Sequence, residues 1–314
     1  MAKIEIPASL KADMPQTLLG RIMSATPIVM TVVATMLAGL ASSEMTKAQY
    51  DRSLAAQQQS KAGDQWSFFQ AKRLRSALQR NTLDLLQASN DIHPLDIAAL
   101  TQPSTPSDGT QKIVALLATE PGQDAFALLQ KSELPTTPNA TPVAPEVTAA
   151  LRAIEDLKPD AEIADRLAQI SHKLLTETIV SAKERTDEFD AATKPVNQVI
   201  DATEAALQSQ PASPAKRDFT AARLRFAALR YDHEARLNQA IASLYELQVR
   251  KNNISAERHH GRSQRFFYGM LGAQLAVIIS TFSIAARQRN LLWILAAAAG
   301  VTALLFAGWV YLYV

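Results

Sequence analysis

The sequence predicts an all-α protein with three transmembrane helices, one N-terminal and two in a C-terminal hairpin, joined by a long extramembrane helical segment. Two blocks of the 314-residue chain, near residues 22–41 and 266–314, are almost free of charge. The residues between them show no alternation of apolar and polar side chains with the two-residue period of a strand. Late in this middle segment, apolar residues instead recur every seven positions, as in helices that pack against each other.

Composition excludes several classes of protein. The net charge of +2 is too small to suggest a protein that binds nucleic acid. The chain has no cysteine, which excludes disulfides, thiolate metal sites and a cysteine nucleophile. No glycine-rich phosphate loop, nucleophile elbow or spaced set of metal ligands occurs in it. We therefore expect a protein that is not an enzyme, with no catalytic residue, no metal, no cofactor and no small-molecule substrate.

Residues 22–42 are predicted to form the first transmembrane helix, after an N-terminal tail over residues 1–21. No residue between Arg21 and Glu44 is charged, and about 20 helical residues cross a hydrocarbon core of about 30 Å. A cleaved signal peptide is the alternative, because "LAGLASS" offers small residues for cleavage. A retained anchor is favoured, since the apolar stretch is longer than in most signal peptides and the tail contains acidic residues and prolines.

The C-terminal block predicts two further transmembrane helices, over residues 266–286 and 291–314. Both stretches are uncharged, and the polar break "RQRN" between them carries Arg287 and Arg289, as in a tight hairpin. Aromatic residues stand near both ends of the last stretch, as in the interfacial belts of membrane proteins. Gln274 is the one strongly polar side chain within these stretches. We expect it to form a hydrogen bond across a helix pair rather than to line a pore.

Residues 43–92 and 216–262 are predicted to be the outgoing and returning helices of an antiparallel stalk with coiled-coil character. Both would leave the same membrane, so their pairing carries little loop-closure cost at the base. In the outgoing helix the apolar residues at helical spacing are Met45, Tyr50, Leu54, Trp66, Phe69, Leu74, Leu78 and Leu85. In the returning helix the seven-residue repeat comprises Phe219, Phe226, His233, Ala240, Leu247 and Ile254. Phe226 and His233 are accordingly expected to pack in the seam between the helices.

Residues 93–215 are predicted to form a helical cap that is interrupted by proline and threonine. The stretches "TQPSTPSDGT" and "LPTTPNATPVAP" read as linkers. Within the cap, an apolar stripe from Ile163 is expected to run as one helix towards Phe189 and to end before Pro195, with a separate helix over residues 196–207.

The stretch "ERHHGRSQRFFYGM", residues 257–270, could be half of a metal site, a catalytic pair, or the point where a soluble helix meets a membrane. His259 and His260 are adjacent, so on a helix they point about 100° apart and do not suit one metal ion. Arginine side chains can instead contact phosphate headgroups. A membrane interface is therefore favoured, and the residues assigned to lipid headgroups are Arg258, His259, His260, Arg262, Arg265, Arg287 and Arg289.

Three motifs in this order resemble a known family. They are "DQWSFFQAKRLR" after the first apolar block, "ERHHGRSQRFFYGMLGAQLAVIIS" entering the second, and "RQRNLLWIL" entering the third. The chain resembles bacterial membrane proteins of the domain of unknown function 4337 family. The resemblance implies one anchor, a helical segment and a C-terminal hairpin, but it brings no established activity. It covers both ends of the chain, so residues 93–215 are interpreted as an insertion.

The aromatic motif after the first span has two interpretations. It comprises Trp66, Phe68, Phe69, Gln70 and Lys72. These side chains either fill the core of the stalk against the returning helix, which is favoured, or dock a partner protein, because Trp, Phe and Arg are enriched at interaction hot spots.

These features together predict a helical membrane protein that acts as a structural, scaffolding or accessory subunit. We expect partners among membrane lipids, further copies of the chain or a membrane complex, and no nucleic acid. A membrane-anchored sensor or regulator of a partner is the alternative, and an oligomeric pore or transporter is less favoured. The expected location is the bacterial inner membrane. The positive-inside rule, applied to the short N-terminal tail and hairpin, favours a periplasmic stalk.

Overall fold

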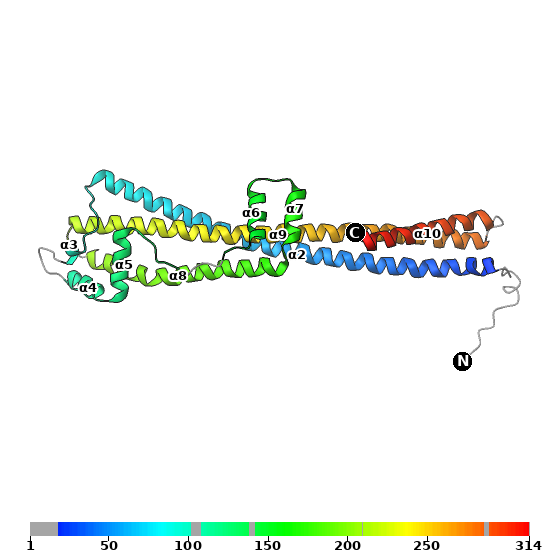
Figure 1. Cartoon of the computed structure of the whole chain (residues 1–314), viewed down its shortest axis with the longest axis horizontal. Coiled ribbons are helices and arrows are strands. Elements are labelled where there is room, and N and C mark those ends of the chain that lie inside the picture. The colour runs from blue at the N-terminus through cyan, green and yellow to red at the C-terminus, as the bar shows by residue number, and fades with distance from the viewer. Residues whose placement is uncertain (1–17, 102–107, 138–141, 209, 286–288, 314) are drawn as a thin grey trace, which may run out of the picture. The chain divides into compact units, whose positions relative to one another are not determined.

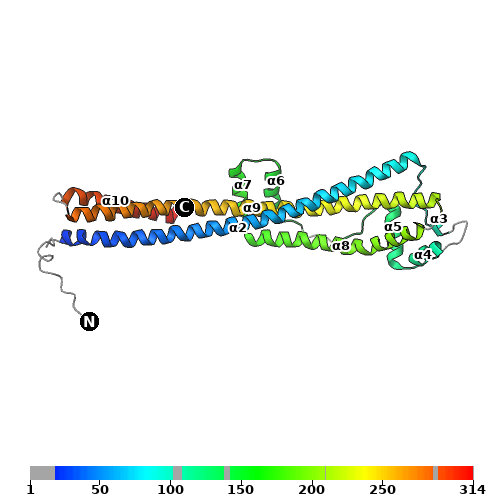
Figure 2. The same ribbon diagram turned by 180° about the vertical axis from the view of Figure 1, so that it is seen from behind.

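The structure is a computed structural model that describes residues 18–101, 108–137, 142–208, 210–285 and 289–313 (Figures 1 and 2). Every regular element in these residues is a helix, which confirms the prediction of an all-α protein for this part of the chain. The chain divides into two compact units, which are described separately. Unit 1 comprises Met1–Ala55 and Asn252–Val314, and unit 2 comprises Ala56–Lys251.

Two long helices contribute to both units. They are α2 (Leu18–Ser89) and α9 (Pro214–Ala285), each with 72 residues. Unit 1 also contains α10 (Arg289–Tyr313). Unit 2 contains the shorter helices α3 (Ile97–Thr101), α4 (Asp108–Leu117), α5 (Glu120–Lys131), α6 (Pro145–Glu155) and α7 (Asp160–Gln169), and the 37-residue α8 (His172–Gln208).

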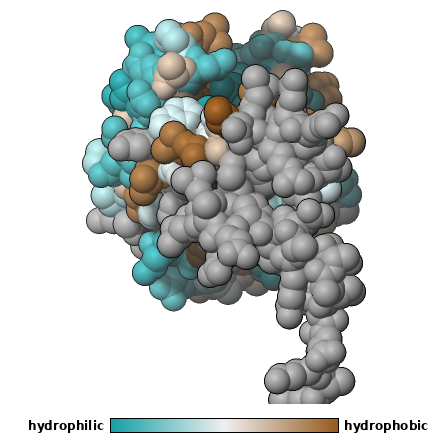
Figure 3. All heavy atoms as spheres, turned by 90° about the vertical axis from the view of Figure 1, so that its right-hand side faces the viewer, coloured by the Kyte–Doolittle hydropathy of each residue, from teal (hydrophilic) through white to brown (hydrophobic). Residues whose placement is uncertain are grey.

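Unit 1 packs its helices through small side chains. One cluster joins Ala34 of α2, Ala273 of α9 and Ala303 of α10, and a second joins Leu37 and Ala41 to Phe266. The large apolar side chains of the same helices point outwards, among them Ile28, Met36, Leu275, Ile278, Phe282 and Leu305. Some of the apolar surface of the molecule is drawn in brown in Figure 3.

Two of the described helices are long and apolar enough to cross a membrane, not three. The apolar windows lie in Ala25–Ser89 of α2 and Pro214–Phe282 of α9. In the third predicted span, the described residues provide only the shorter apolar stretch Ile294–Phe306. That stretch is too short by itself for a hydrocarbon core that takes about 20 helical residues to cross.

Unit 2 is built around large buried side chains, in contrast to unit 1. Its main core joins α3, α4 and α5 to α8 and α9, as seen at one end of the long helices in Figure 1. Phe126 of α5, and Phe219 and Phe226 of α9, are each about 1% exposed, and the rings of Phe126 and Phe219 lie 6.5 Å apart. A smaller cluster packs Leu83 of α2 against Ala221 and Leu224 of α9.

The prediction that Pro195 ends a helix is wrong, because α8 continues through it to Gln208. A proline inside a helix costs about 3 kcal/mol or more, since it removes one backbone hydrogen bond. Here Phe189, Val196 and Val199 are buried on either side of the proline. Burial of such side chains contributes about 1.5–3 kcal/mol each, which offsets the loss. The predicted single helix from Ile163 to Phe189 is instead divided, since α7 ends at Gln169 and α8 begins at His172.

The buried face of α2 also differs from the prediction. Tyr50, Leu74, Leu78 and Leu85, which belong to the predicted apolar stripe, are each more than half exposed. The buried residues are instead small ones at seven-residue spacing, namely Ala41, Ala48, Ala55, Ala62 and Ser76. In α9, Phe219, Phe226 and Leu247 of the predicted repeat are buried, while Ala240 is exposed. A second series of buried small residues in α9 comprises Ala221, Ala228, Ala235, Ala242, Ala256 and Ser263.

Two serine hydroxyls demonstrate how closely these faces approach. In unit 2, Ser76 Oγ of α2 donates a hydrogen bond of 2.9 Å to the carbonyl oxygen of Ala228 in α9. In unit 1, Ser263 Oγ of α9 donates one of 2.7 Å to the carbonyl oxygen of Ala41 in α2. A short side chain reaches the backbone of a neighbouring helix only where the residues between the two helices are small. Alanine and serine therefore occupy most of this contact, and Leu83 is accommodated at the next seven-residue position, where it packs against Ala221 and Leu224.

Candidate functional site

Two clusters contain most of the residues that the sequence singles out. The first, here the motif cluster, lies in unit 2 and joins Trp66–Lys72 of α2 to acidic residues of α9. The second, here the histidine cluster, lies in unit 1 and surrounds His259 and His260.

In the motif cluster, the aromatic residues of the motif divide between two environments. Trp66 is partly buried, and its Nε1 donates a hydrogen bond of 2.7 Å to Oε1 of Glu246 in α9. Its ring makes an edge contact with Phe69 at 5.3 Å between centroids. Phe68 and Gln70 are exposed. Trp66 and Phe69 therefore occupy the side of α2 that faces α9, and Phe68 and Gln70 do not.

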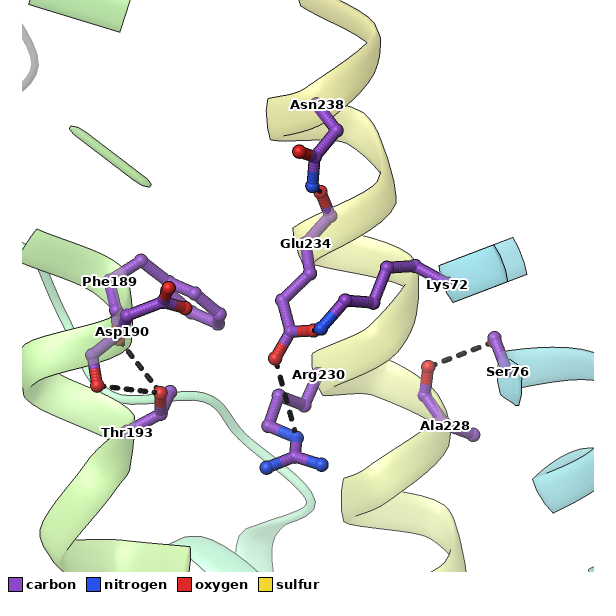
Figure 4. Close-up of polar contacts among 9 residues, drawn as sticks. All are labelled: Lys72, Ser76, Phe189, Asp190, Thr193, Ala228, Arg230, Glu234 and Asn238. Atoms are coloured by element: carbon purple, nitrogen blue, oxygen red, sulfur yellow. Dashed lines mark hydrogen bonds and ion pairs between the residues drawn. The ribbon is translucent and has the colours of Figure 1, made fainter. Parts of the chain in front are cut away.

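Lys72 forms an ion pair with the buried carboxylate of Glu234 in α9. Figure 4 shows Lys72 reaching one oxygen of this carboxylate while Arg230 approaches the other, with its Nε 3.5 Å from Oε1. The Lys72 ammonium also lies 5.5 Å from the centre of the Tyr231 ring, within the range of a cation–π interaction. A buried carboxylate that meets two cations is electrostatically satisfied.

The next residue, Arg73, pairs with Asp232, which lies two residues before Glu234 on α9. Arg236 also holds this carboxylate at 2.9 Å, and Arg80 lies 3.8 Å away. Burial by itself would raise the pKa of Asp232, but the hydrogen bond from Arg73 and the charges of Arg236 and Arg80 outweigh it and lower the pKa. Asp232 therefore stays ionised at neutral pH.

Asp190 of α8 stands at the edge of the same cluster and behaves differently. Its pKa lies above its ordinary value of 3.8, because the neighbouring helices displace part of its hydration and the charge of Glu234 repels it. Figure 4 places Asp190 beside Phe189, on the far side of Glu234 from Ser76. Thr193 bonds to the backbone carbonyls of Phe189 and Asp190, not to the carboxylate.

His233 lies between the two acidic residues of α9 in sequence but faces α8. Its ring centre is 4.4 Å from that of Phe189, so it packs against an aromatic ring as a neutral group would. Burial lowers the pKa of His233, and the charge of Arg236 lowers it further. His233 is therefore a packing residue and is neutral at neutral pH.

In the histidine cluster, the two adjacent histidines have different partners. Nδ1 of His259 lies 2.6 Å from Oε2 of Glu44 in α2, and Lys47 lies 2.7 Å from the other oxygen. Burial opposes ionisation of Glu44, but hydrogen bonds from Lys47 and His259 outweigh it and lower its pKa. Nε2 of His260 lies 3.1 Å from the amide nitrogen of Gln264 instead.

Among the residues that the structure describes, no three His, Asp or Glu side chains are grouped closely enough to hold a metal ion. Beside His260, α2 and α9 enclose a groove of about 510 Å³, whose walls are mostly apolar and include Met45, Phe267 and Met270. Such a groove can hold an apolar chain, with His260 and Gln264 as its polar positions.

The arginines of this region lie in different settings. Arg258 is exposed, and Arg262 is partly buried. The guanidinium of Arg265 lies over the ring of Trp309 in α10, 5.3 Å from its centre, within the range of a cation–π interaction. Arg287 and the side chain of Arg289 lie outside the described residues.

The predicted hydrogen bond of Gln274 across a helix pair is not found. Gln274 is exposed on α9, and Ala273 and Ala276 beside it occupy the packed face. Only small residues fit at that contact, which directs the longer amide side chain outwards.

Sequence reasoning missed the acidic partners of these residues: Glu44, Asp232, Glu234 and Glu246. The signal that could have found them is the charge pattern of the two long helices. Lys72 and Arg73 in α2 match acidic residues at Glu234 and Asp232 in α9. This signal requires the register of one helix against the other, which the sequence alone does not supply.

The comparisons with known proteins identify part of the chain. No curated protein and no solved structure matches it. A family model does match one segment of the chain, residues 21–113. This segment begins at the start of the first apolar block, contains Trp66–Lys72, and continues into the region interpreted as an insertion. The motif at Arg258–Arg265 lies outside it. Residues 21–113 match the family described as domain of unknown function (DUF4337), which confirms the resemblance for the N-terminal part of the chain.

Proposed function

We propose that this protein is a non-enzymatic integral membrane protein that acts as a structural, scaffolding or accessory subunit through its helical extramembrane part. The observation that carries the proposal is the packing of unit 1. Its three helices meet at Ala34, Ala273 and Ala303, and although Leu37 and Phe266 are buried beside them, many of its large apolar side chains face outwards. A water-soluble unit would have the reverse arrangement, because burial of large apolar side chains drives its folding. In lipid, close packing of small residues is what holds helices together.

The membrane part of the proposal comprises three spans. The first two are the apolar parts of α2 and α9. We assign α10 as the third because it has 25 residues, and because its surface, including Val301, Leu304 and Leu305, is as apolar as that of the other two. In addition, its Ala303 lies against Gly272 of α9, where a methyl group added to the glycine would sit 3.5 Å from the alanine Cβ.

The extramembrane part would be an antiparallel stalk with a helical cap. Residue pairs support this arrangement, because partners in α9 descend in number as those in α2 ascend: Lys72 with Glu234, Ser76 with Ala228, and Asn90 with Arg217. Of the polar residues of the motif Trp66–Lys72, Lys72 is occupied in these contacts. Such pairs hold one helix to another, so they suit a structural part.

The proposed location is the bacterial inner membrane with a periplasmic stalk. The basic residues of the short tail and of the hairpin, which include Arg21, Arg287 and Arg289, support a cytoplasmic position for both. Arg258 and Arg265 would then contact headgroups on the opposite side, and the apolar groove beside His260 would hold an acyl chain.

Cysteine labelling in intact cells tests the arrangement, because the natural chain has no cysteine. We would compare Gln123→Cys in α5, Gln288→Cys in the hairpin, and a cysteine appended after Val314. A membrane-impermeant maleimide should label the first and the last, and should label Gln288→Cys only after permeabilisation. Labelling of Gln288→Cys alone would invert the orientation. Protection of the appended cysteine together with Gln288→Cys would contradict the third span.

Resistance to extraction tests the membrane proposal itself, and native mass tests the structural role. Membranes washed with alkaline carbonate should retain the chain. The detergent-solubilised protein should then run at the mass of an oligomer or of a complex with another membrane protein. Release of the chain by carbonate would contradict the membrane proposal, and a monomer without partners would contradict the role as a subunit.

A further inference from the structure

In unit 2, the side of α2 that faces away from α9 carries an exposed apolar stripe. The positions of the stripe alternate in spacings of three and four residues and comprise Ala71, Leu74, Leu78, Asn81, Leu85 and Ala88. Each leucine stands two residues from a buried position, Ser76 or Leu83, and therefore about 200° around the helix from it. Leu74, Leu78 and Leu85 are 62%, 53% and 71% exposed.

This spacing is that of the seam of a two-helix coiled coil. Three leucines aligned on one face form a continuous apolar surface, which in water indicates a contact that the single chain leaves unfilled. The neighbouring residues Ser76 and Leu83 already pack against α9. A further helix can therefore lie along the stripe without disturbing the contacts of α2 within its own chain.

We propose that this stripe binds the same stripe of a second copy of the chain, in parallel and in register. Asn81 at its centre supports self-recognition, because a side-chain amide offers both a donor and an acceptor and is its own complement. An asparagine in the seam disfavours shifted registers, since a shift of one heptad would leave its amide facing Leu74 or Ala88. No charged residue lies within the stripe, so two copies do not repel each other there.

The direction and register follow from the membrane, and in this respect the inference rests on the proposed function. Two copies anchored in one bilayer send α2 out in the same direction, and each residue stands at the same distance from the bilayer. Leu74, Leu78 and Leu85 of one copy would therefore meet their own counterparts. A partner of other chemistry would need a matching seam with an amide at the same height.

The exposed amide of Gln274 in unit 1 supports association independently. In the proposed span it would face hydrocarbon, where an unpaired amide is costly. A second copy presents the same amide at the same depth in the bilayer. The two glutamines can then form hydrogen bonds with each other, which would satisfy both.

The length of the stripe predicts where association can be observed. Residues 71–88 extend over about 27 Å of helix, which is short for a coiled coil between free chains. Anchoring in one membrane raises the local concentration of the second stripe and compensates for this weakness. The full-length protein in its membrane is therefore the form to test.

Disulfide trapping tests the contact. Leu78→Cys retains Asn81 and places a cysteine at the seam, while Gln87→Cys places one on an exposed position of α2 outside the stripe. Mild oxidation of membranes should link Leu78→Cys into a product of twice the chain mass, about tenfold more than Gln87→Cys. Adding Leu85→Asp or Asn81→Asp to Leu78→Cys should reduce the product about tenfold, because two carboxylates would be buried together. Both positions are exposed in the single chain, so these changes leave its fold intact.

The outcomes separate this inference from the proposed function when the same membranes are washed with alkaline carbonate. Retention with linkage at Leu78→Cys alone supports the inference. Retention without linkage, or with equal linkage at both positions, refutes the contact and leaves the membrane proposal standing. A product of any mass other than twice the chain mass refutes the second copy as the occupant. Release from the membrane overturns the proposed function, and the parallel register of the two stripes is overturned with it.

Discussion

The two units of this chain are stabilised by opposite arrangements of similar helices. Unit 1 has alanine where its three helices meet and many leucine, isoleucine and phenylalanine side chains outside, with Leu37 and Phe266 as buried exceptions. Unit 2 buries phenylalanine and leucine in its core and joins α2 to α9 by ion pairs to the buried carboxylates of Asp232 and Glu234. With unit 1 in lipid, as we propose, the difference teaches that burial of a large apolar residue depends on the surrounding solvent. Water drives such residues inwards, while lipid places no penalty on their exposure.

The largest effect is expected in the core of unit 2. Phe226→Ala should lower the free energy of unfolding by about 3–5 kcal/mol, because it removes a fully buried ring and leaves a cavity. Chemical unfolding of the detergent-solubilised protein, followed by the loss of helical signal, measures it. Val180→Ala, on an exposed position of α8, is the control and should change stability by less than about 0.5 kcal/mol. An equal loss in both variants would contradict the assigned core.

Unit 1 should respond to the reverse substitution. Ala303→Leu adds bulk where Ala34, Ala273 and Ala303 meet, and should destabilise the helix contact by about 1–3 kcal/mol. Thermal unfolding in detergent, followed by the loss of helical signal, measures the loss. Leu305→Ala changes size on an outward position of the same helix and should have little effect. If Ala303→Leu is tolerated as well as Leu305→Ala, small residues do not determine the packing of this unit.

The buried carboxylate of Glu44 should make unit 1 sensitive to acid. Its pKa is lowered from an ordinary value of 4.5, so its contribution to stability is present above that value and is lost as pH falls through the lowered pKa. Glu44→Gln should cost about 1–3 kcal/mol at neutral pH, because His259 and Lys47 lose a charged partner. With Glu44→Gln, the unfolding temperature should also fall less steeply as the pH is lowered.

A matched control for Glu44→Gln is Glu162→Gln in α7. Glu162 also has a lowered pKa, owing to its hydrogen bond with Arg166, but this pair lies on the surface. Its removal should have the smaller effect, since solvent screens an exposed pair. Acid profiles that are equally changed by both substitutions would show that burial of Glu44 adds nothing.

The smallest effect, with the opposite sign, is expected at Asp190 in unit 2. Its pKa is raised, so its ionised form is less stable in the folded protein, and stability increases as pH falls through the raised pKa. Asp190→Asn should therefore stabilise the protein at neutral pH by less than about 0.5 kcal/mol, because the residue is exposed. Thermal unfolding at neutral and acidic pH would test this, and a destabilised variant at neutral pH would contradict repulsion by Glu234.

The motif Trp66–Lys72 shows how far a sequence can predict a site. The pattern indicates a helix and two possible uses for its aromatic residues. It does not tell which of these residues face the neighbouring helix and which stay exposed. The structure directs Trp66 and Lys72 to Glu246 and Glu234, and leaves Phe68 exposed. Residues that are close in sequence are separated by the 100° turn between successive positions of a helix. Their roles depend on where the neighbouring helix lies.

Pro195 is a similar case. The sequence predicts a helix end there, because proline lacks a backbone donor. The buried residues on both sides of it in α8 belong to contacts with other helices and outweigh the lost hydrogen bond. Local preference is a weak guide wherever such contacts contribute more free energy.

The sequence by itself determined the helical class, the two long apolar segments and the absence of charge within them, because these follow from composition and periodicity along one chain. Only the tertiary structure decided which face of α2 is buried. Leucine is the more hydrophobic residue, yet Ala48, Ala55 and Ala62 are buried and Leu74, Leu78 and Leu85 are not. Two helix backbones approach closely only where side chains are small, and that requirement exists only once both helices are in place.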